Sequence, residues 1–215
     1  MSLAVLASGN GSNLQALLDA SSRGEIPRIA LVVANLPCPA LERAAAAAVP
    51  ARLIPHQDFA RREDFDRAVL EAVRGVGADL ICLAGFMRLL TPTLLEPFQG
   101  RVLNIHPSLL PAFPGLHAQR QAWAAGVRVA GCTVHFVDVG TDTGAIIAQA
   151  AVPVLAGDSE ASLSERILAQ EHLLYPAAVG WVARGSVRLE GGRAVADGSL
   201  WPGSAAGIAL HSPSV

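Results

Sequence analysis

Two polar side chains stand two positions apart at the end of a short apolar run. Asn104 and His106 follow Arg101-Val102-Leu103, and on a strand this spacing places both side chains on one face. Three prolines between positions 107 and 114 fix φ and remove backbone donors, so residues 107–115 are predicted to form a stiff loop. Taken alone, the pair is also consistent with a capping asparagine and a buried structural histidine.

A carboxylate that could act with this pair lies in a Gly-containing loop. Asp142 occurs within Val139-Gly140-Thr141-Asp142-Thr143-Gly144, where it could also be an ordinary turn residue. An amide can stabilise a developing oxyanion, and a carboxylate holds an imidazole in one tautomer and raises its pKa, which suits proton transfer. A metal site built from His106, His135 and Asp142 is a weaker alternative, because the three are not clustered in sequence. Ser108 lacks a G-x-S-x-G context, so it is interpreted as part of the stiff loop.

The N-terminal residues predict an anion site. The apolar run Leu3–Ala7 is typical of a buried strand, and a Gly-rich turn (residues 8–13, Ser-Gly-Asn-Gly-Ser-Asn) follows it. Leu14, Leu17 and Leu18 then recur at helical spacing. Free backbone N–H groups at a helix N-terminus attract anions, although the same pattern also fits a plain strand-to-helix turn.

A dinucleotide fingerprint fits this turn poorly. Leu14 stands where G-x-G-x-x-G needs its third glycine, and the next apolar run (29–34) ends in Asn35 rather than an acidic residue. A phosphate monoester fits better, because Ser12 and Asn13 can add side-chain donors to the backbone ones.

The apolar pattern predicts an α/β fold, namely a mostly parallel twisted sheet with helices on both faces and an antiparallel C-terminal portion. Strands are expected at 29–34, 51–54, 79–83, 128–137 and 145–154, and helices at 40–48, 64–73 and 117–125. A long helix should begin at Ser162 or Ser164 and kink or break near Pro176, before a hairpin over 187–195. We expect one domain over residues 1–200 and a mobile tail over 201–215.

Composition narrows the classes of function. The formal net charge of −2 provides no basic field for nucleic acid, and no apolar run reaches membrane-spanning length. All 16 basic residues are arginine, so no lysine is available as a nucleophile or Schiff base. Cys38, Cys82 and Cys132 are widely spaced and are expected to be reduced thiols of a cytoplasmic protein without a structural zinc site.

An apolar segment (residues 84–90, Ala-Gly-Phe-Met-Arg-Leu-Leu) follows the strand expected at 79–83. Ligands bind at this end of open α/β sheets, so the segment could wall a flat apolar ligand or simply close the core. Earlier in the chain, Arg61 and Arg62 precede the helix expected at 64–73 and could be solvated charges or ligand contacts.

Three stretches together resemble the phosphoribosylglycinamide formyltransferases, the folate-dependent transformylases of purine synthesis. They are residues 8–13, residues 83–88 and residues 104–111, and residues 156–160 and 170–172 fit the same family. The resemblance runs from Leu3 to about Trp181. It implies a Rossmann-like formyltransferase fold, with a phosphate-binding N-terminal half and a folate-binding C-terminal half.

The resemblance also implies roles for individual residues. It assigns catalysis to Asn104, His106 and Asp142. It assigns acceptor binding to Gly11, Ser12, Asn13, Gln170 and Glu171. It assigns folate binding to Arg62, Met87, Arg88, Leu89, Leu90, Asn104, Asp138, Val139, Gly140, Thr141 and Asp142. His117 and His135 match family positions but receive no chemistry. Thr143 departs from a common glycine, which bears on the mobility of the loop, and Leu110-Pro111 is a candidate cis peptide.

The implied activity is formyl transfer from 10-formyltetrahydrofolate, as a cosubstrate and without a metal, to the amine of 5'-phosphoribosylglycinamide. The partners would be small molecules, with no nucleic acid or membrane, and the chain would be a monomer or homodimer. A formyltetrahydrofolate hydrolase and a methionyl-tRNA formyltransferase are disfavoured, because each is expected to carry a further domain and the second needs a basic face. A non-enzymatic phosphate-sensing module would leave Asn104, His106 and Asp142 unexplained.

Overall fold

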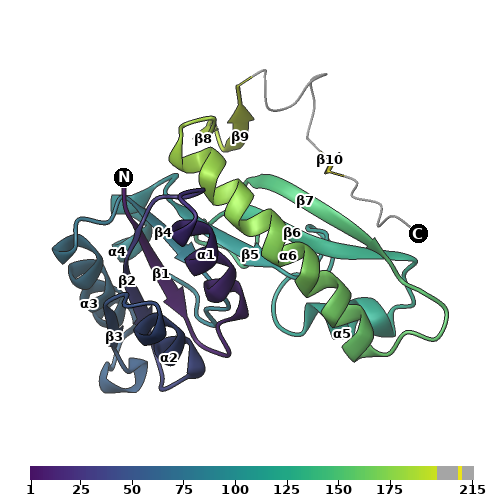
Figure 1. Ribbon diagram of the computed structural model, residues 1–215, viewed down its shortest axis with the longest axis horizontal. Coiled ribbons are helices and arrows are strands. Elements are labelled where there is room, and N and C mark those ends of the chain that lie inside the picture. Colours follow the sequence, from purple (N-terminus) through teal and green to yellow (C-terminus); the bar gives the residue numbers. More distant parts are fainter. Residues whose placement is uncertain (198–207, 210–215) are drawn as a thin grey trace.

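The computed structural model describes residues 1–197 and 208–209 and is built on one twisted sheet (Figure 1). In the described part of the chain the strand order is β10-β7-β6-β5-β4-β1-β2-β3. The bounds are Leu3–Ala7 (β1), Ile29–Ala34 (β2), Ala51–Leu53 (β3), Leu80–Leu83 (β4), Val102–His106 (β5), Val129–Phe136 (β6), Ile146–Pro153 (β7) and Ile208–Ala209 (β10). Strands β1 to β5 pair in parallel, whereas β6 is antiparallel to both β5 and β7. The predicted mostly parallel sheet with an antiparallel C-terminal portion is therefore confirmed.

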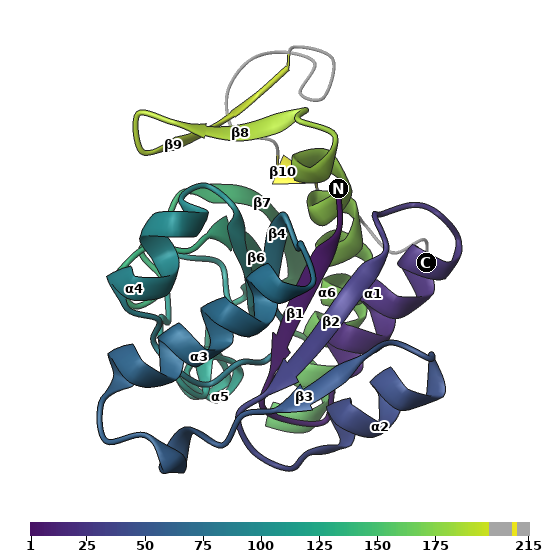
Figure 2. The same ribbon diagram turned by 90° about the vertical axis from the view of Figure 1, so that its left-hand side faces the viewer.

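Helices cover both faces of the parallel part, as Figure 2 shows. Helices α1 (Ser12–Ser22), α2 (Pro39–Ala46) and α6 (Glu160–Ala183) pack on one face, and α3 (Arg62–Gly75) and α4 (Pro92–Leu95) on the other. Helix α5 (Ala118–Ala124) contacts α6, and 3-10 turns lie at His56–Asp58 and Glu96–Phe98. The two faces bury separate apolar clusters, one around Leu14, Leu17 and Ile167 and the other around Phe65, Val69 and Leu94.

The pairing of β5 with β6 brings polar side chains together on one face of the sheet, next to the second apolar cluster. Asn104 lies opposite His135, and His106 lies opposite Thr133, so all four side chains share one face of the sheet. Helix α6 packs against β5, β6 and β7 from the other side. The polar face is covered instead by the loops that follow β5 and β6.

Helix α6 differs from its prediction at both ends. It begins at Glu160 rather than Ser162 or Ser164, because Ser159 is the N-cap and exchanges hydrogen bonds with Ser162 in a capping box. It also continues through Pro176 to Ala183 without a break. An internal proline costs about 3 kcal/mol or more, and the complete burial of Tyr175, with its neighbours, against the sheet offsets this cost.

The C-terminal hairpin is confirmed, with β8 at Val187–Glu190 and β9 at Arg193–Ala196. The predicted mobile tail (201–215) lies outside the described residues, apart from Ile208 and Ala209, which pair with β7. Among the described residues, no helix has both the length and the apolar character needed to cross a membrane.

Candidate active site

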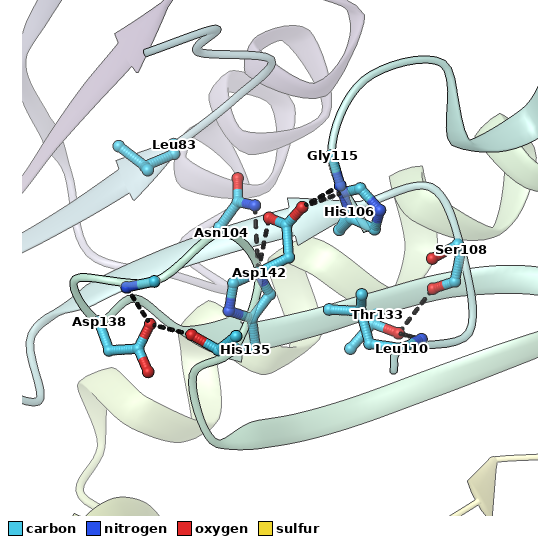
Figure 3. Close-up of polar contacts among 12 residues, drawn as sticks. Leu83, Asn104, His106, Ser108, Leu110, Gly115, Thr133, His135, Asp138 and Asp142 are labelled. Atoms are coloured by element: carbon cyan, nitrogen blue, oxygen red, sulfur yellow. Dashed lines mark hydrogen bonds and ion pairs between the residues drawn. The ribbon is translucent and has the colours of Figure 1, made fainter. Parts of the chain in front are cut away.

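The loop after β6 brings Asp142 onto the polar face, between the two histidines (Figure 3). Its carboxylate oxygens lie 3.3 Å from His106 Nδ1 and 3.7 Å from His135 Nε2. The Gly115 N–H donates to the same carboxylate at 2.7 Å and so joins the two covering loops. Residues predicted from two separate stretches of sequence, Asn104 and His106 from one and Asp142 from the other, therefore meet in one cluster together with His135.

Both ring nitrogens of His106 face acceptors. The Phe113 carbonyl lies 2.9 Å from Nε2, and because a carbonyl can only accept, Nε2 carries a proton. A neutral ring would then turn the lone pair of Nδ1 toward the Asp142 carboxylate at 3.3 Å. A ring with a proton on each nitrogen donates to both acceptors, so this geometry suits protonated His106.

His135 holds the amide of Asn104. Its Nδ1 lies 2.8 Å from the Phe136 carbonyl and therefore carries the proton, which leaves Nε2 to accept from Asn104 Nδ2 at 3.1 Å. Burial lowers the pKa of His135, against the opposing effects of the Phe136 carbonyl and the Asp142 carboxylate. The ring is accordingly neutral near pH 7. Its bond to Asn104 was not predicted, because alternation along β6 places His135 on the face of Thr133 but does not give the register of β6 against β5.

The stiff loop (residues 107–115) is held by hydrogen bonds to Thr133 of β6 and by a bond within the loop itself. The Thr133 hydroxyl donates to the Ser108 carbonyl at 2.6 Å and accepts from Leu110 N–H at 3.0 Å, while the Ser108 hydroxyl donates to the Ala112 carbonyl at 2.6 Å. The interpretation of Ser108 as part of this loop is confirmed, and the candidate cis peptide Leu110-Pro111 is present.

The metal alternative is not supported by the geometry. Although His106, His135 and Asp142 lie together, no group of three His, Cys, Asp or Glu residues in the described part of the chain is arranged to hold a metal ion.

The Gly-rich turn leads directly into α1, with Gly11 in a left-handed conformation at the N-cap (φ 75°). A Cβ at Gly11 would press on the backbone of Ala40, so glycine is required there for packing as well as for φ. Ser12 is half-buried at the first helical position. Arg43, which no sequence motif indicated, donates to the Asn10 carbonyl at 2.8 Å and adds positive charge beside the turn.

Helix α6 contributes an acid to the same end of the sheet. Asn13 Nδ2 donates to Glu171 Oε2 at 2.7 Å, so this amide is held by the protein rather than turned freely toward an anion. Burial raises the pKa of Glu171, and the Asn13 bond opposes that shift. Gln170 is half-buried beside it.

The apolar segment (residues 84–90) leaves β4 beside Asn104, since Leu83 pairs with Asn104. Met87 is 67% exposed and Leu89 is also exposed, whereas Leu90 is buried in the core. The Arg88 guanidinium lies 5.2 Å from the Phe65 ring centroid. Arg62 is exposed at the start of α3. Part of the segment therefore closes the core, as one of its two interpretations expects, and part of it faces outward.

The loop that carries Asp142 is tied across its base. Asp138 Oδ1 accepts from the Thr143 hydroxyl at 2.8 Å and from Gly140 N–H at 3.0 Å. A Cβ at Gly140 would collide with the Thr143 hydroxyl, so the bond needs glycine there. Val139 is 68% exposed, Thr141 is exposed, and Asp142 has a left-handed backbone (φ 55°). Thr143, which stands where a glycine is common in the family that the sequence resembles, therefore adds a hydrogen bond within the loop.

Comparison with known proteins identifies the family. A family model described as "Formyl transferase" matches residues 1–179. The phosphoribosylglycinamide formyltransferase of Escherichia coli (strain K12) is 42% identical over 204 residues, which cover 94% of this chain and 96% of that protein. The trifunctional purine biosynthetic protein adenosine-3 of Drosophila melanogaster is 50% identical over 86% of this chain, which spans only 14% of that protein's length. A crystal structure of glycinamide ribonucleotide transformylase 1 from Symbiobacterium toebii has a TM-score of 0.89, 50% identity and coverage of 91% of this chain and 93% of its own. The chain belongs to the formyl transferase family.

Proposed function

We propose that this chain transfers the formyl group of 10-formyltetrahydrofolate to the amine of 5'-phosphoribosylglycinamide, a step of purine biosynthesis. The observation that carries the proposal is the cluster of Asn104, His106 and Asp142, with its carboxylate 3.3 Å from the imidazole. The names of the E. coli relative and of the S. toebii structure support the same reaction.

The Gly-rich turn would bind the phosphate of the acceptor. Backbone N–H groups at Gly11 and Ser12 open helix α1, where the helix dipole favours an anion, and Arg43 adds charge nearby. Asn13 would act largely through Glu171, whose carboxylate it holds at 2.7 Å. Glu171 and Gln170 would then contact the glycinamide part of the acceptor.

The folate would lie along the exposed side of the apolar segment. Met87, Leu89 and Val139 are exposed apolar residues of the loops that follow β4 and β6, the two strands beside β5, which fits a flat ring system with a polar edge. Arg62 and Arg88 could meet the carboxylates of its tail, and the backbone of residues 138–142 could meet its ring. The folate supplies the formyl group and is released after each turnover.

The polar cluster would carry the chemistry of transfer. One Asn104 Nδ2 hydrogen goes to His135, which leaves the second to donate to the formyl oxygen as negative charge develops there. Protonated His106 would stabilise the same charge and then pass a proton toward the departing folate nitrogen. Since the Phe113 carbonyl holds Nε2, the side of the ring shared with Asp142 is where that proton would be exchanged.

The test is dependence on the acceptor. Purified protein should form tetrahydrofolate from 10-formyltetrahydrofolate only when 5'-phosphoribosylglycinamide is present, with the N-formyl product in equal amount. Equal turnover without the acceptor would show a hydrolase and overturn the proposal. We expect small-molecule partners alone, a cytoplasmic location, no requirement for a metal, and a monomer or homodimer.

A further inference from the structure

A buried serine connects the Gly-rich turn to the apolar segment. Ser8 is the first residue after β1 and is 9% exposed. Its hydroxyl donates to Asn35 Oδ1 at 2.6 Å and accepts from Met87 N–H at 3.0 Å. A hydroxyl has one proton and can accept as well as donate, so both bonds form at once.

The strand order explains why these three residues meet. Strand β1 lies between β4 and β2, and the three run in parallel, so their C-terminal ends lie side by side. Ser8 follows β1, Asn35 follows β2, and Met87 lies in the segment that follows β4. The hydroxyl therefore joins three neighbouring strand ends.

Asn35 is fixed from its other side. It is 3% exposed, its backbone carbonyl accepts from the His56 backbone N–H at 3.2 Å, and its Nδ2 lies 3.2 Å from His56 Nδ1, which can then accept from it. Because Asn35 Oδ1 is held in place, the Ser8 hydroxyl proton points toward it. A lone pair of the Ser8 oxygen then remains to accept from Met87 N–H. Asn35, which stands where a dinucleotide-binding chain would carry an acid, thus orients a hydroxyl instead.

We propose that Ser8 is a positioning residue, whose hydroxyl holds the Met87 backbone and so fixes the folate-binding segment relative to the phosphate-binding turn. The inference rests on the proposed function, which assigns these two segments to the two substrates. The formyl carbon must lie within reach of the acceptor amine, and a fixed link between the segments supplies that alignment in advance.

The main test is Ser8→Ala, which leaves the Met87 N–H without its acceptor. We expect the KM for 10-formyltetrahydrofolate and the Kd for tetrahydrofolate, measured by calorimetry, to rise roughly 5–30-fold, the size of a lost buried hydrogen bond. The KM for the acceptor should stay within about twofold, because the backbone of residues 11–13 keeps its own contacts.

Ser2→Ala is the matched control. Ser2 stands before β1, at the opposite end of the same strand, is also buried, and donates to the Gly77 carbonyl at 2.9 Å. It should lower the thermal midpoint as Ser8→Ala does and leave both KM values unchanged. Asn35→Ala should reproduce the Ser8→Ala effect, and the double variant should be no worse than the more severe single one, since the two side chains act in series.

An unchanged folate KM in Ser8→Ala, or in Asn35→Ala where Ser8→Ala does not fold, would overturn the inference. An equal rise in both KM values, or the same change in Ser2→Ala, would also overturn it. If the wild-type protein shows no acceptor-dependent turnover, the proposed function itself fails; if it is active and both variants bind folate normally, only this inference fails.

Discussion

The two halves of the sheet differ in what covers their faces. In the half from β1 to β4, helices cover both faces, and the residues of β1, β2 and β4 are apolar and buried, whereas the edge strand β3 is exposed. In the half from β5 to β7, α6 covers one face while loops cover the other, which carries Asn104, His106, Thr133, His135 and Gln149. Strand β5 is the boundary, since Val102 still belongs to the second apolar cluster and Asn104, two residues on, does not.

This difference shows how one sheet separates stability from chemistry. A helix on the second face would bury the polar groups of β5 and β6 without room for substrates. Loops tied down by Thr133 and Asp142 shield those groups while leaving an approach from outside. We therefore expect substitutions in the half that has helices on both faces to change stability, and substitutions on the polar face to change turnover.

His106→Ala should have the largest effect on the polar face. Removing an acid–base group lowers kcat by about 10²–10⁴-fold, and steady-state kinetics with both substrates saturating measures this. The thermal midpoint of the same sample should change little, because the ring contributes to the polar cluster and not to the apolar core. A kcat near that of the wild-type protein would remove His106 from its proposed role.

Leu31→Ala tests the half with two helical layers. Leu31 is fully buried in β2, and truncation of such a side chain costs about 2–5 kcal/mol. For a chain of this size the thermal midpoint should fall by about 4–20 °C, measured by calorimetry. At a temperature where the variant is folded, kcat should remain within about threefold, because distant sites act independently. A large loss of kcat in the folded variant would contradict the separation of the two halves.

Thr133→Val should affect both properties, because it keeps the shape of a fully buried side chain and removes its hydroxyl. The Ser108 carbonyl and the Leu110 N–H lose their partner, at a cost of about 1–3 kcal/mol. Displacement of the stiff loop should lower kcat roughly tenfold. The reverse exchange, Val33→Thr in β2, is the control: it should destabilise the fold with kcat unchanged, and equal kcat values in the two variants would break the comparison.

The smallest of the expected effects is a pH dependence of the free energy of unfolding that arises from His135. Burial lowers its pKa below the ordinary 6.5, so the unfolded chain binds a proton at a pH where the folded protein does not. The free energy of unfolding should therefore fall as the pH decreases below 6.5, by at most about 1.4 kcal/mol per unit from this group. Urea unfolding at several pH values, compared between wild type and His135→Gln, measures the contribution; identical slopes would contradict it.

Local patterns were sufficient for much of the fold. Apolar runs identified the parallel strands, and alternation placed Asn104 and His106 on one face. The role of His135 depends on the register of β6 against β5, which no local pattern contains. The bond between Asn13 and Glu171 joins residues 158 positions apart, and its geometry follows only from how α6 packs on α1. The predicted start of α6, at Ser162 or Ser164, lies two to four residues after the observed one, because Ser162 forms the capping box from inside the helix with Ser159 as the cap.

The bond between Thr143 and Asp138 couples positions 140 and 143 of this loop. A Cβ at position 140 would collide with the Thr143 hydroxyl, so a side chain there would displace the hydroxyl and break its bond to Asp138. Replacing Thr143 should therefore cost less stability when position 140 already carries a side chain, because the bond is then already lost. A double-mutant cycle of Gly140→Ala and Thr143→Ala would measure this coupling.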